Sequence, residues 1–167
     1  SLLTGMYLMN HRSGRNGTPL DARHTNIALE ARKAGYDPSL FGYTDTTPDP
    51  RGKHPNDPAL TAYDEGVLPG FRAPLHLPED MGQWVSDLIA RGYDLPNGRD
   101  DVFRPKKNFV KPDDRGFRYI PTVFPAEESE TAFITDEFLK WLLGRQNKPW
   151  FAHFVFFRPH PPFIAPE

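Results

Sequence analysis

The stretch that decides the fold is Trp150-Phe151-Ala152-His153-Phe154-Val155-Phe156-Phe157, near the end of the chain. Aromatic side chains and valine dominate it, and they barely alternate with polar residues. This pattern predicts a strand that is buried on both faces, as in a parallel sheet covered by helices. Pro159 ends the predicted strand, because a proline nitrogen cannot donate a hydrogen bond to a neighbouring strand.

His160 comes directly after this strand, in a turn that also contains Pro159, Pro161 and Pro162. Open α/β sheets bind ligands in the crevice beyond the carboxyl ends of their strands. A titratable side chain held there by prolines is therefore a candidate functional residue. The alternative is a histidine that packs against prolines in an ordinary loop.

Composition limits the class of protein. The chain has 167 residues, of which 38% are hydrophobic and 25% charged, and these values predict one globular domain with a core. The 19 prolines and 13 glycines predict extensive loops. A net charge of −2 argues against a nucleic-acid partner, which would require a basic stripe. The absence of cysteine excludes disulfides and thiolate metal sites.

No apolar run reaches the roughly 18 residues that a membrane span needs, so we expect no membrane partner. No signal peptide is visible, and the composition leaves a cytoplasmic and a periplasmic location open. The first residues, Ser1 to Tyr7, resemble the end of a helix that Gly5 terminates, and the last ones form a loop. We therefore expect the chain to be a piece of a longer protein.

The order of the predicted elements indicates an α/β fold. A helix over 27–34, capped by Thr25 or Asn26, precedes a strand over 39–44. A long irregular insertion follows, then two helices and the closing strand, which together predict a largely parallel sheet covered by helices. The helix that starts at Pro78 and ends at Gly92 has an apolar stripe of core residues: Met81, Trp84, Val85, Leu88 and Ile89.

The last helix is expected to begin at a Ser129 cap and to end near Gly144. Its predicted buried face consists of Ala132, Phe133, Leu139, Trp141, Leu142 and Leu143. Two polar segments, 10–21 and 97–125, are predicted to be exposed. The first contains a basic cluster that charge alone assigns to a solvated loop: His11, Arg12 and Arg15.

Four side chains are candidates for chemistry: His160, Asn16, Tyr43 and Asp45. Tyr43 lies at the end of the first strand, so parallel strands would place it on the same sheet edge as His160. Tyr43 and Asp45 would point the same way if that strand continues through both. An imidazole, a phenol and an amide that converge could bind an oxyanion and move a proton. No complete catalytic set is present, since the chain lacks HExxH, GxSxG and a glycine-rich phosphate loop.

Five blocks in collinear order resemble a known family. Ser1-Leu2-Leu3-Thr4-Gly5 is similar to the tail of the sulfatase signature, with Ser1 at its second serine position. The other blocks are similar to the phosphonate monoester hydrolases and related arylsulfatases of the alkaline phosphatase superfamily. These blocks are Tyr7 to Arg12, Pro19 to Asp21, Gly42 to Thr46 and Arg158 to Phe163.

The resemblance implies an α/β fold of the alkaline phosphatase type, with helices around a mostly parallel sheet. Residues 1–167 would be part of one catalytic domain, without its N-terminal metal and nucleophile segment and without its C-terminal part. It also implies a formylglycine nucleophile and a divalent metal, calcium or manganese, both supplied from outside this chain. The substrate would be a small anionic ester, and a homo-oligomeric parent is left open.

The resemblance also assigns roles to residues. His160 matches a histidine that contacts the sulfuryl or phosphoryl group and can act as an acid. Asn16 matches an asparagine of the active-site cleft, and Tyr43 a tyrosine that contacts the substrate. Asp45 falls where the phosphonate hydrolases usually have threonine. A carboxylate there would repel an anionic ester, so it would be protonated, metal-facing or turned away.

These assignments support three hypotheses. The first is a fragment of a formylglycine-dependent hydrolase of sulfate esters, that is, a sulfatase. The second is the same machinery acting on phosphonate monoesters or phosphodiesters, because the groups that separate the two are partly outside this chain. The third is a catalytically inactive α/β domain that binds anionic ligands or partners.

Overall fold

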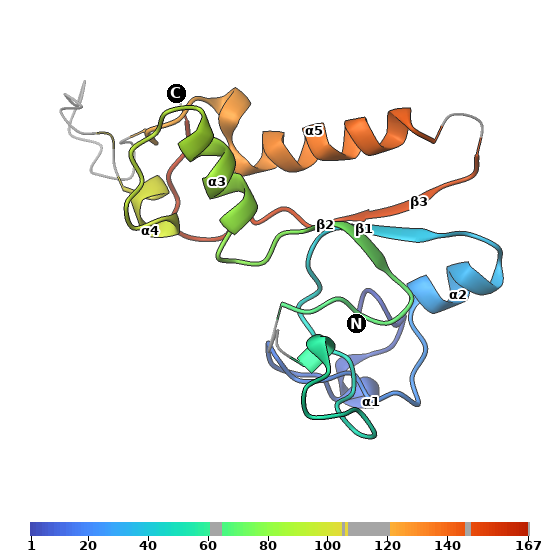
Figure 1. The fold of residues 1–167 in the computed structure, drawn as a ribbon. Coiled ribbons are helices and arrows are strands. Elements are labelled where there is room, and N and C mark those ends of the chain that lie inside the picture. Colours follow the sequence, from blue (N-terminus) through green and yellow to red (C-terminus); the bar gives the residue numbers. More distant parts are fainter. Residues whose placement is uncertain (61–64, 105, 107–120, 146–147, 167) are drawn as a thin grey trace. The chain divides into compact units, whose positions relative to one another are not determined.

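The computed structural model describes residues 1–60, 65–104, 106, 121–145 and 148–166. The chain divides into two compact units, each built from two segments (Figure 1). The first unit contains Ser1–Pro78 and Trp141–Val155, and the second contains Glu79–Lys140 and Phe156–Glu167. No helix among the described residues is both long and apolar enough to cross a membrane.

A parallel sheet lies in the first unit. Its three strands, in the spatial order β2-β1-β3, are β1 (Pro38–Gly42), β2 (Arg72–His76) and β3 (Phe151–Phe154). Phe41 is paired with Phe154 on one side, and Gly42 with His76 on the other. The prediction of a parallel sheet is confirmed, and the carboxyl ends of all three strands lie at one edge.

The closing strand is less buried than its sequence predicts. Every residue of the central strand β1 is buried, whereas every residue of β3 is only half-buried. The expectation of a strand covered on both faces is wrong for β3, and it ends at Phe154 instead of Phe157. The reason is its position: in the described sheet β3 pairs with β1 alone, while β1 has a neighbour on each side.

The second unit is largely helical. Its elements are α3 (Gly82–Ala90), α4 (Arg99–Val102), a 3-10 turn (Ala126–Glu128) and most of α5 (Glu130–Leu143). Trp84 is 1% exposed and meets Phe124 edge-on, with ring centroids 5.1 Å apart. Its indole N–H donates to the Glu128 carbonyl at 2.8 Å. The core role predicted for Trp84 is confirmed, whereas Ile89 of the same stripe is 50% exposed.

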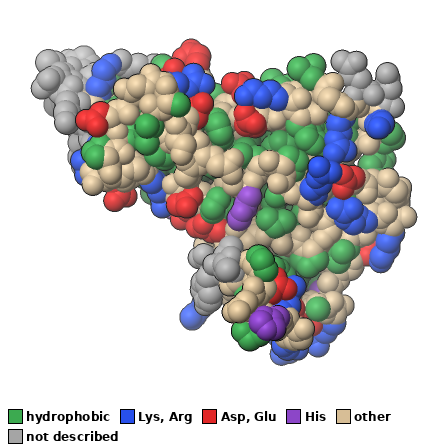
Figure 2. Space-filling model, in the orientation of Figure 1, with side chains coloured by type: hydrophobic (Ala, Val, Ile, Leu, Met, Phe, Trp, Pro, Cys, Tyr) green, Lys and Arg blue, Asp and Glu red, His purple; other side chains and the backbone are tan. Residues whose placement is uncertain are grey.

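Helix α5 begins as predicted but buries a different set of residues. Ser129 Oγ accepts the Ala132 amide at 3.2 Å, which confirms the cap. Only Glu130 and Ile134 of the helix are buried, and Leu139 and Leu143 are 48% and 70% exposed. The predicted buried face is therefore wrong for Leu139 and Leu143, whereas Trp141 packs edge-on against Phe41 with ring centroids 5.6 Å apart. Figure 2 shows hydrophobic side chains exposed among charged ones of both signs.

The segment 97–125 was predicted to be exposed, and its described part differs from that expectation. In 97–125, residues 105 and 107–120 lie outside the described residues. Asp101, at the start of that segment, is 7% exposed and accepts the Asn97 amide at 2.7 Å. Its burial contradicts a wholly solvated segment, because the carboxylate closes the turn that starts α4.

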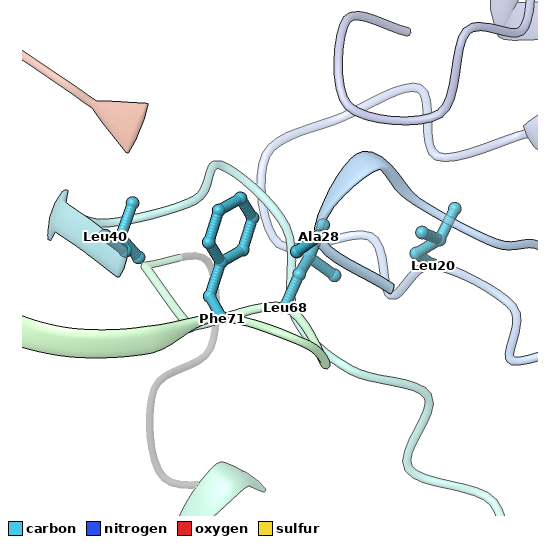
Figure 3. Close-up of a cluster of buried hydrophobic side chains, with 5 residues drawn as sticks. All are labelled: Leu20, Ala28, Leu40, Leu68 and Phe71. Atoms are coloured by element: carbon cyan, nitrogen blue, oxygen red, sulfur yellow. The ribbon is translucent and has the colours of Figure 1, made fainter. Parts of the chain in front are cut away.

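The core of the first unit gathers side chains from separate segments: Leu20, Ala28, Leu40, Leu68 and Phe71 (Figure 3). Ala28 lies on helix α2 (Ile27–Lys33), which is capped by Asn26 and not by Thr25, the other expected cap. Asn26 Oδ1 accepts the amides of Ala28 at 2.9 Å and Leu29 at 3.1 Å. Its side-chain amide also donates to the Pro69 carbonyl at 3.0 Å, so the cap joins two segments of this core.

Short turns complete the first unit. The 3-10 turn Pro58–Leu60 lies in the long insertion, and α1 (Leu8–His11) follows the first residues. The predicted helix end at Gly5 is a single turn: the Gly5 amide donates to the Ser1 carbonyl at 2.9 Å, and Gly5 has φ +66°.

Candidate active site

Tyr43 lies at the carboxyl edge of the sheet, directly after β1, and is 8% exposed. The strand ends at Gly42, whose φ of +111° is outside the β region. Thr44 then fixes the chain, because its amide and its hydroxyl both donate to the Gly66 carbonyl, at 2.8 and 2.7 Å. Tyr43 is buried and Asp45 is exposed, so the expected common direction of these two side chains is not observed. The strand does not reach Asp45.

Asn16 is exposed in the loop after α1. This loop is joined to the segment that follows Asp45: Thr46 Oγ1 donates to the Thr18 carbonyl at 2.7 Å, and the Leu20 amide donates to the Thr47 carbonyl at 3.0 Å. The structure therefore places the Asn16 loop beside the Asp45 segment in the first unit. The sequence gives no sign of this pairing, since the two segments are far apart along the chain.

An ion-pair cluster holds the same two segments together. Arg51 Nε donates to both carboxylate oxygens of Asp49, at 2.9 and 3.0 Å, and Arg51 Nη2 lies 2.9 Å from Asp21. Asp49 also accepts the Ala22 amide at 2.9 Å. The hydrogen bonds from Arg51, and then that from Ala22, hold the pKa of Asp49 well below its usual value. A charged cluster across the two segments fixes their relative position.

A hollow of about 410 Å³ lies beside this cluster. His11 lines it and is 5% exposed, which contradicts its assignment to a solvated loop, whereas Arg12 and Arg15 are exposed as predicted. His11 Nδ1 accepts the Ser13 amide at 3.2 Å, so Nε2 carries the proton and donates to Ser1 Oγ at 3.0 Å. Burial lowers the pKa of this imidazole. His11 is therefore a neutral hydrogen-bonded residue that joins Ser1 to α1.

His160 lies in the second unit, in the turn after Phe157. Its amide donates to the Phe157 carbonyl at 2.9 Å, and its ring is exposed. Nδ1 lies 2.8 Å from the Pro161 carbonyl oxygen. A carbonyl can only accept, so Nδ1 carries a proton and Nε2 is the nitrogen that can exchange a proton with a ligand.

A buried carboxyl group lies close to this turn. Glu130, the first residue of α5, is 5% exposed and accepts the Phe157 amide at 3.1 Å. Burial raises its pKa, against the effects of the Phe157 hydrogen bond, of Thr131 and of the Arg158 charge. The sequence does not single out Glu130, because a glutamate after a Ser cap is ordinary in the first turn of a helix. Glu130 is buried because the chain returns to it at Phe157.

A second hollow of about 440 Å³ lies in the second unit, with largely apolar walls. Glu130, Arg158 and Pro159 line it together with several aromatic side chains, among them Trp84, Phe103, Phe124 and Phe157. Among the described residues, no group of three or more His, Asp or Glu side chains could hold a metal ion.

Comparison with known proteins defines the class of protein. A family model described as Sulfatase matches residues 1–167, and the chain belongs to the sulfatase family. The resemblance that the sequence blocks indicated is thereby confirmed.

Individual relatives are more specific. The chain is 52% identical to the phosphonate monoester hydrolase of Agrobacterium radiobacter, whose crystal structure it matches with a TM-score of 0.83 over 99% of this chain and 32% of that one. The phosphonate monoester hydrolase SpPMH from Silicibacter pomeroyi is 46% identical, with a TM-score of 0.84 and the same coverage. These matches confirm the predicted α/β fold of the alkaline phosphatase type.

A third relative is the multifunctional alkaline phosphatase superfamily protein PehA of Trinickia caryophylli. It is 42% identical over 165 residues, which are 99% of this chain and 31% of PehA. The chain thus spans about a third of the length of the relatives that it matches. Two of these three relatives are named as phosphonate monoester hydrolases.

Proposed function

We propose that the chain is part of a hydrolase that cleaves phosphonate monoesters, small anionic esters of phosphorus. The observation that supports this most strongly is the 52% identity, over 99% of the chain, to a phosphonate monoester hydrolase. We call the longer protein that would contain the chain the parent protein. In it, residues 1–167 would be part of one catalytic domain.

Three polar residues would act on the substrate. His160 would donate a proton from Nε2 to the leaving oxygen, and in its charged form would stabilise the anionic transition state. The Asn16 amide and the Tyr43 hydroxyl would donate hydrogen bonds to non-bridging phosphonyl oxygens. For Asn16, the exposed side chain and the fixed loop support this role. For Tyr43, its place at the carboxyl edge of β1 supports it.

The remaining chemistry would come from outside this chain. A formylglycine would supply the nucleophile, and a divalent metal, calcium or manganese, would neutralise charge on the ester. The residues of this chain would bind and orient the ester and supply a proton.

Sulfate-ester hydrolysis is the second candidate function. The match of the whole chain to the Sulfatase family model favours it. Asp45, which replaces the usual threonine, also distinguishes this chain from the phosphonate branch that it resembles. Its carboxylate is exposed and would repel either ester, because a phosphonate monoester and an aryl sulfate each carry one negative charge.

A substrate panel tests the proposal. The purified parent protein would be assayed with aryl phosphonate monoesters, aryl sulfates and phosphodiesters that share one p-nitrophenyl leaving group, before and after treatment with a chelator. We expect the highest kcat/KM for the phosphonate monoester, and loss of activity on chelation that added metal restores.

Two results would contradict the proposal. A higher kcat/KM for the aryl sulfate would favour the second candidate function. No turnover of any ester, with the protein folded and metal added, would favour an inactive domain that binds anionic ligands or partners.

A further inference from the structure

The second unit contains a buried carboxyl group for which the proposed reaction has no role. Glu130 begins α5 and is 5% exposed. One oxygen, Oε1, accepts the Phe157 amide at 3.1 Å, and the other, Oε2, accepts the Thr131 hydroxyl at 3.3 Å. The carboxyl group is therefore hydrogen-bonded at both oxygens and held against the chain that precedes His160.

Phe157 transmits this constraint to His160 in two ways. Its carbonyl accepts the His160 amide at 2.9 Å, and its ring centroid lies 4.7 Å from that of the imidazole. Phe157 is itself 6% exposed, so its backbone has little freedom to move. A shift of the Phe157 amide would therefore move both the backbone and the ring of His160.

Arg158 holds the turn from another direction. Its Nη1 donates to the His160 carbonyl at 3.1 Å and also to the Pro162 carbonyl. Its guanidinium lies over the Phe103 ring, 5.0 Å from the centroid. The positive charge of Arg158 also acts to lower the pKa of Glu130, against the larger effect of burial.

The geometry points to Glu130 as a positioning residue for His160: its carboxyl oxygen anchors the Phe157 amide and so fixes the direction of the imidazole. This inference rests on the proposed function, in which Nε2 of His160 meets the substrate. Glu130 itself touches neither substrate nor reacting atoms in this assignment. Its contribution is the orientation of the imidazole before the substrate arrives.

The essential property of Glu130 is its acceptor oxygen. A buried amide without an acceptor is unfavourable, so the Phe157 N–H would seek another partner if the carboxyl group were removed. Burial raises the pKa of Glu130, but a protonated carboxyl group still has a carbonyl oxygen that accepts. Glutamine at position 130 should therefore still position His160, whereas a side chain of the same length without an oxygen should lose this role.

Variants of the parent protein separate these properties. Glu130→Gln keeps the acceptor, and Glu130→Met keeps the length but removes the acceptor. Glu130→Asp keeps the charge, but its side chain is one methylene shorter, so the carboxylate lies farther from the Phe157 amide. This variant is used in place of Glu130→Met if Glu130→Met does not fold. Glu137→Met is the matched control, because Glu137 lies on the same helix and pairs only with the exposed Lys140 at 2.6 Å in the described contacts.

We expect Glu130→Met to lower kcat about 10- to 100-fold with KM changed less than about 3-fold, since misplaced catalytic groups lose rate more than binding. Glu130→Gln should recover at least about a third of the wild-type kcat, and Glu137→Met should match the wild type. Melting temperatures would confirm that each variant is folded.

A second measurement needs no substrate. The imidazole signals of His160 would be followed by NMR in protein with 15N-labelled histidine, and identified by their loss in His160→Gln. We expect these signals to shift in Glu130→Met and to stay in place in Glu130→Gln and Glu137→Met. If no ester is turned over, the proposed function fails while this experiment still tests the role of Glu130.

Two outcomes would overturn the inference. Unchanged kcat and unchanged His160 signals in folded Glu130→Met, or in Glu130→Asp where Glu130→Met is unfolded, would show that Glu130 does not position His160. Equal losses in folded Glu130→Gln and Glu130→Met would show that the negative charge, and not the acceptor oxygen, is what matters.

Discussion

Gly42 and Val155 approach each other so closely that a Cβ atom on Gly42 would lie 2.7 Å from the Val155 carbonyl oxygen and 2.9 Å from the Val155 Cβ. The Val155 amide also donates to the Phe41 carbonyl at 2.9 Å. The ends of β1 and β3 are therefore in direct contact, immediately before Tyr43. This close approach determines where Tyr43 leaves the sheet.

The first prediction concerns this contact. Gly42→Ala should destabilise the parent protein by more than the roughly 1–2 kcal/mol that a left-handed conformation costs a residue with a side chain. Gly92→Ala is the matched control, since Gly92 has φ +101° but a Cβ atom added to it would meet no atom within 4 Å. Urea unfolding of both variants measures the difference. Equal losses of unfolding free energy would show that the Val155 contact has no effect of its own.

The Asn26 cap gives a second prediction. Asn26→Ala removes both hydrogen bonds to the first turn of α2 and the bond to Pro69, so it should cost about 1–2 kcal/mol in unfolding free energy. Asn26→Ser keeps a capping acceptor without placing a charge in a site that is 2% exposed, and it loses the donor to Pro69, so it should cost less. Thermal and urea unfolding would rank the variants. An Asn26→Ser variant as unstable as Asn26→Ala would assign the effect to the Pro69 bond.

Asp49 gives a prediction about pH. Its pKa is lowered in the folded protein, so its charge stabilises the fold above the unfolded pKa of roughly 3.9 and loses that effect as the pH falls below it. The urea midpoint of Asp49→Asn should therefore lie well below that of the wild type at pH 7, and the gap should narrow as the pH falls below about 4. Asp136→Asn, on exposed α5 surface, should show little difference at either pH. A gap that is constant with pH would contradict a role of the Asp49 charge.

His160→Ala tests the assignment of the proton donor. In the parent protein we expect kcat to fall on the order of 10²- to 10⁴-fold, which is typical for loss of a general acid. The melting temperature should stay close to that of the wild type, because the imidazole is exposed. His54→Ala, which changes an exposed histidine of the first unit, should leave kcat unaffected. A rate within about 3-fold of the wild type would show that His160 is an ordinary loop residue without a catalytic role.

Asp45→Thr tests the one departure from the family pattern. Two like unit charges about 7 Å apart in water repel each other by about 0.6 kcal/mol, and on that scale removing the Asp45 carboxylate should raise kcat/KM for an anionic phosphonate monoester about 3-fold. Added salt should reduce the difference between the variant and the wild type. The exposed Asp136→Thr variant is the control. A decrease in kcat/KM would instead assign Asp45 a productive contact.

Local patterns were sufficient for several elements. The helix that begins at Ile27 was predicted correctly, and the structure selects Asn26 from the two expected caps, Thr25 and Asn26. The capping side chain and the apolar spacing are both local properties. The Ser129 cap was found for the same reason. The parallel sheet followed from the order of helices and strands, and Trp84 was correctly placed in the core.

The burial of several residues was predicted incorrectly from the sequence. The aromatic run 150–157 predicts a covered strand, yet β3 is shorter and half-buried, since its position beside β1 decides how much of it is covered. For two polar residues the sequence predicted too little burial. His11 and Asp101 were expected on exposed segments and are buried, because local partners hydrogen-bond them.

The sequence by itself determined the family, the α/β order of elements and the candidate residues Asn16, Tyr43, Asp45 and His160. Only the tertiary structure showed that the Asn16 loop is joined to the Asp45 segment, and that Glu130 holds the chain before His160. The physical reason is the range of the interactions. Caps and periodic apolar faces involve neighbours along the chain, whereas the bonds from Thr46 to Thr18 and from Phe157 to Glu130 join residues that only folding brings together.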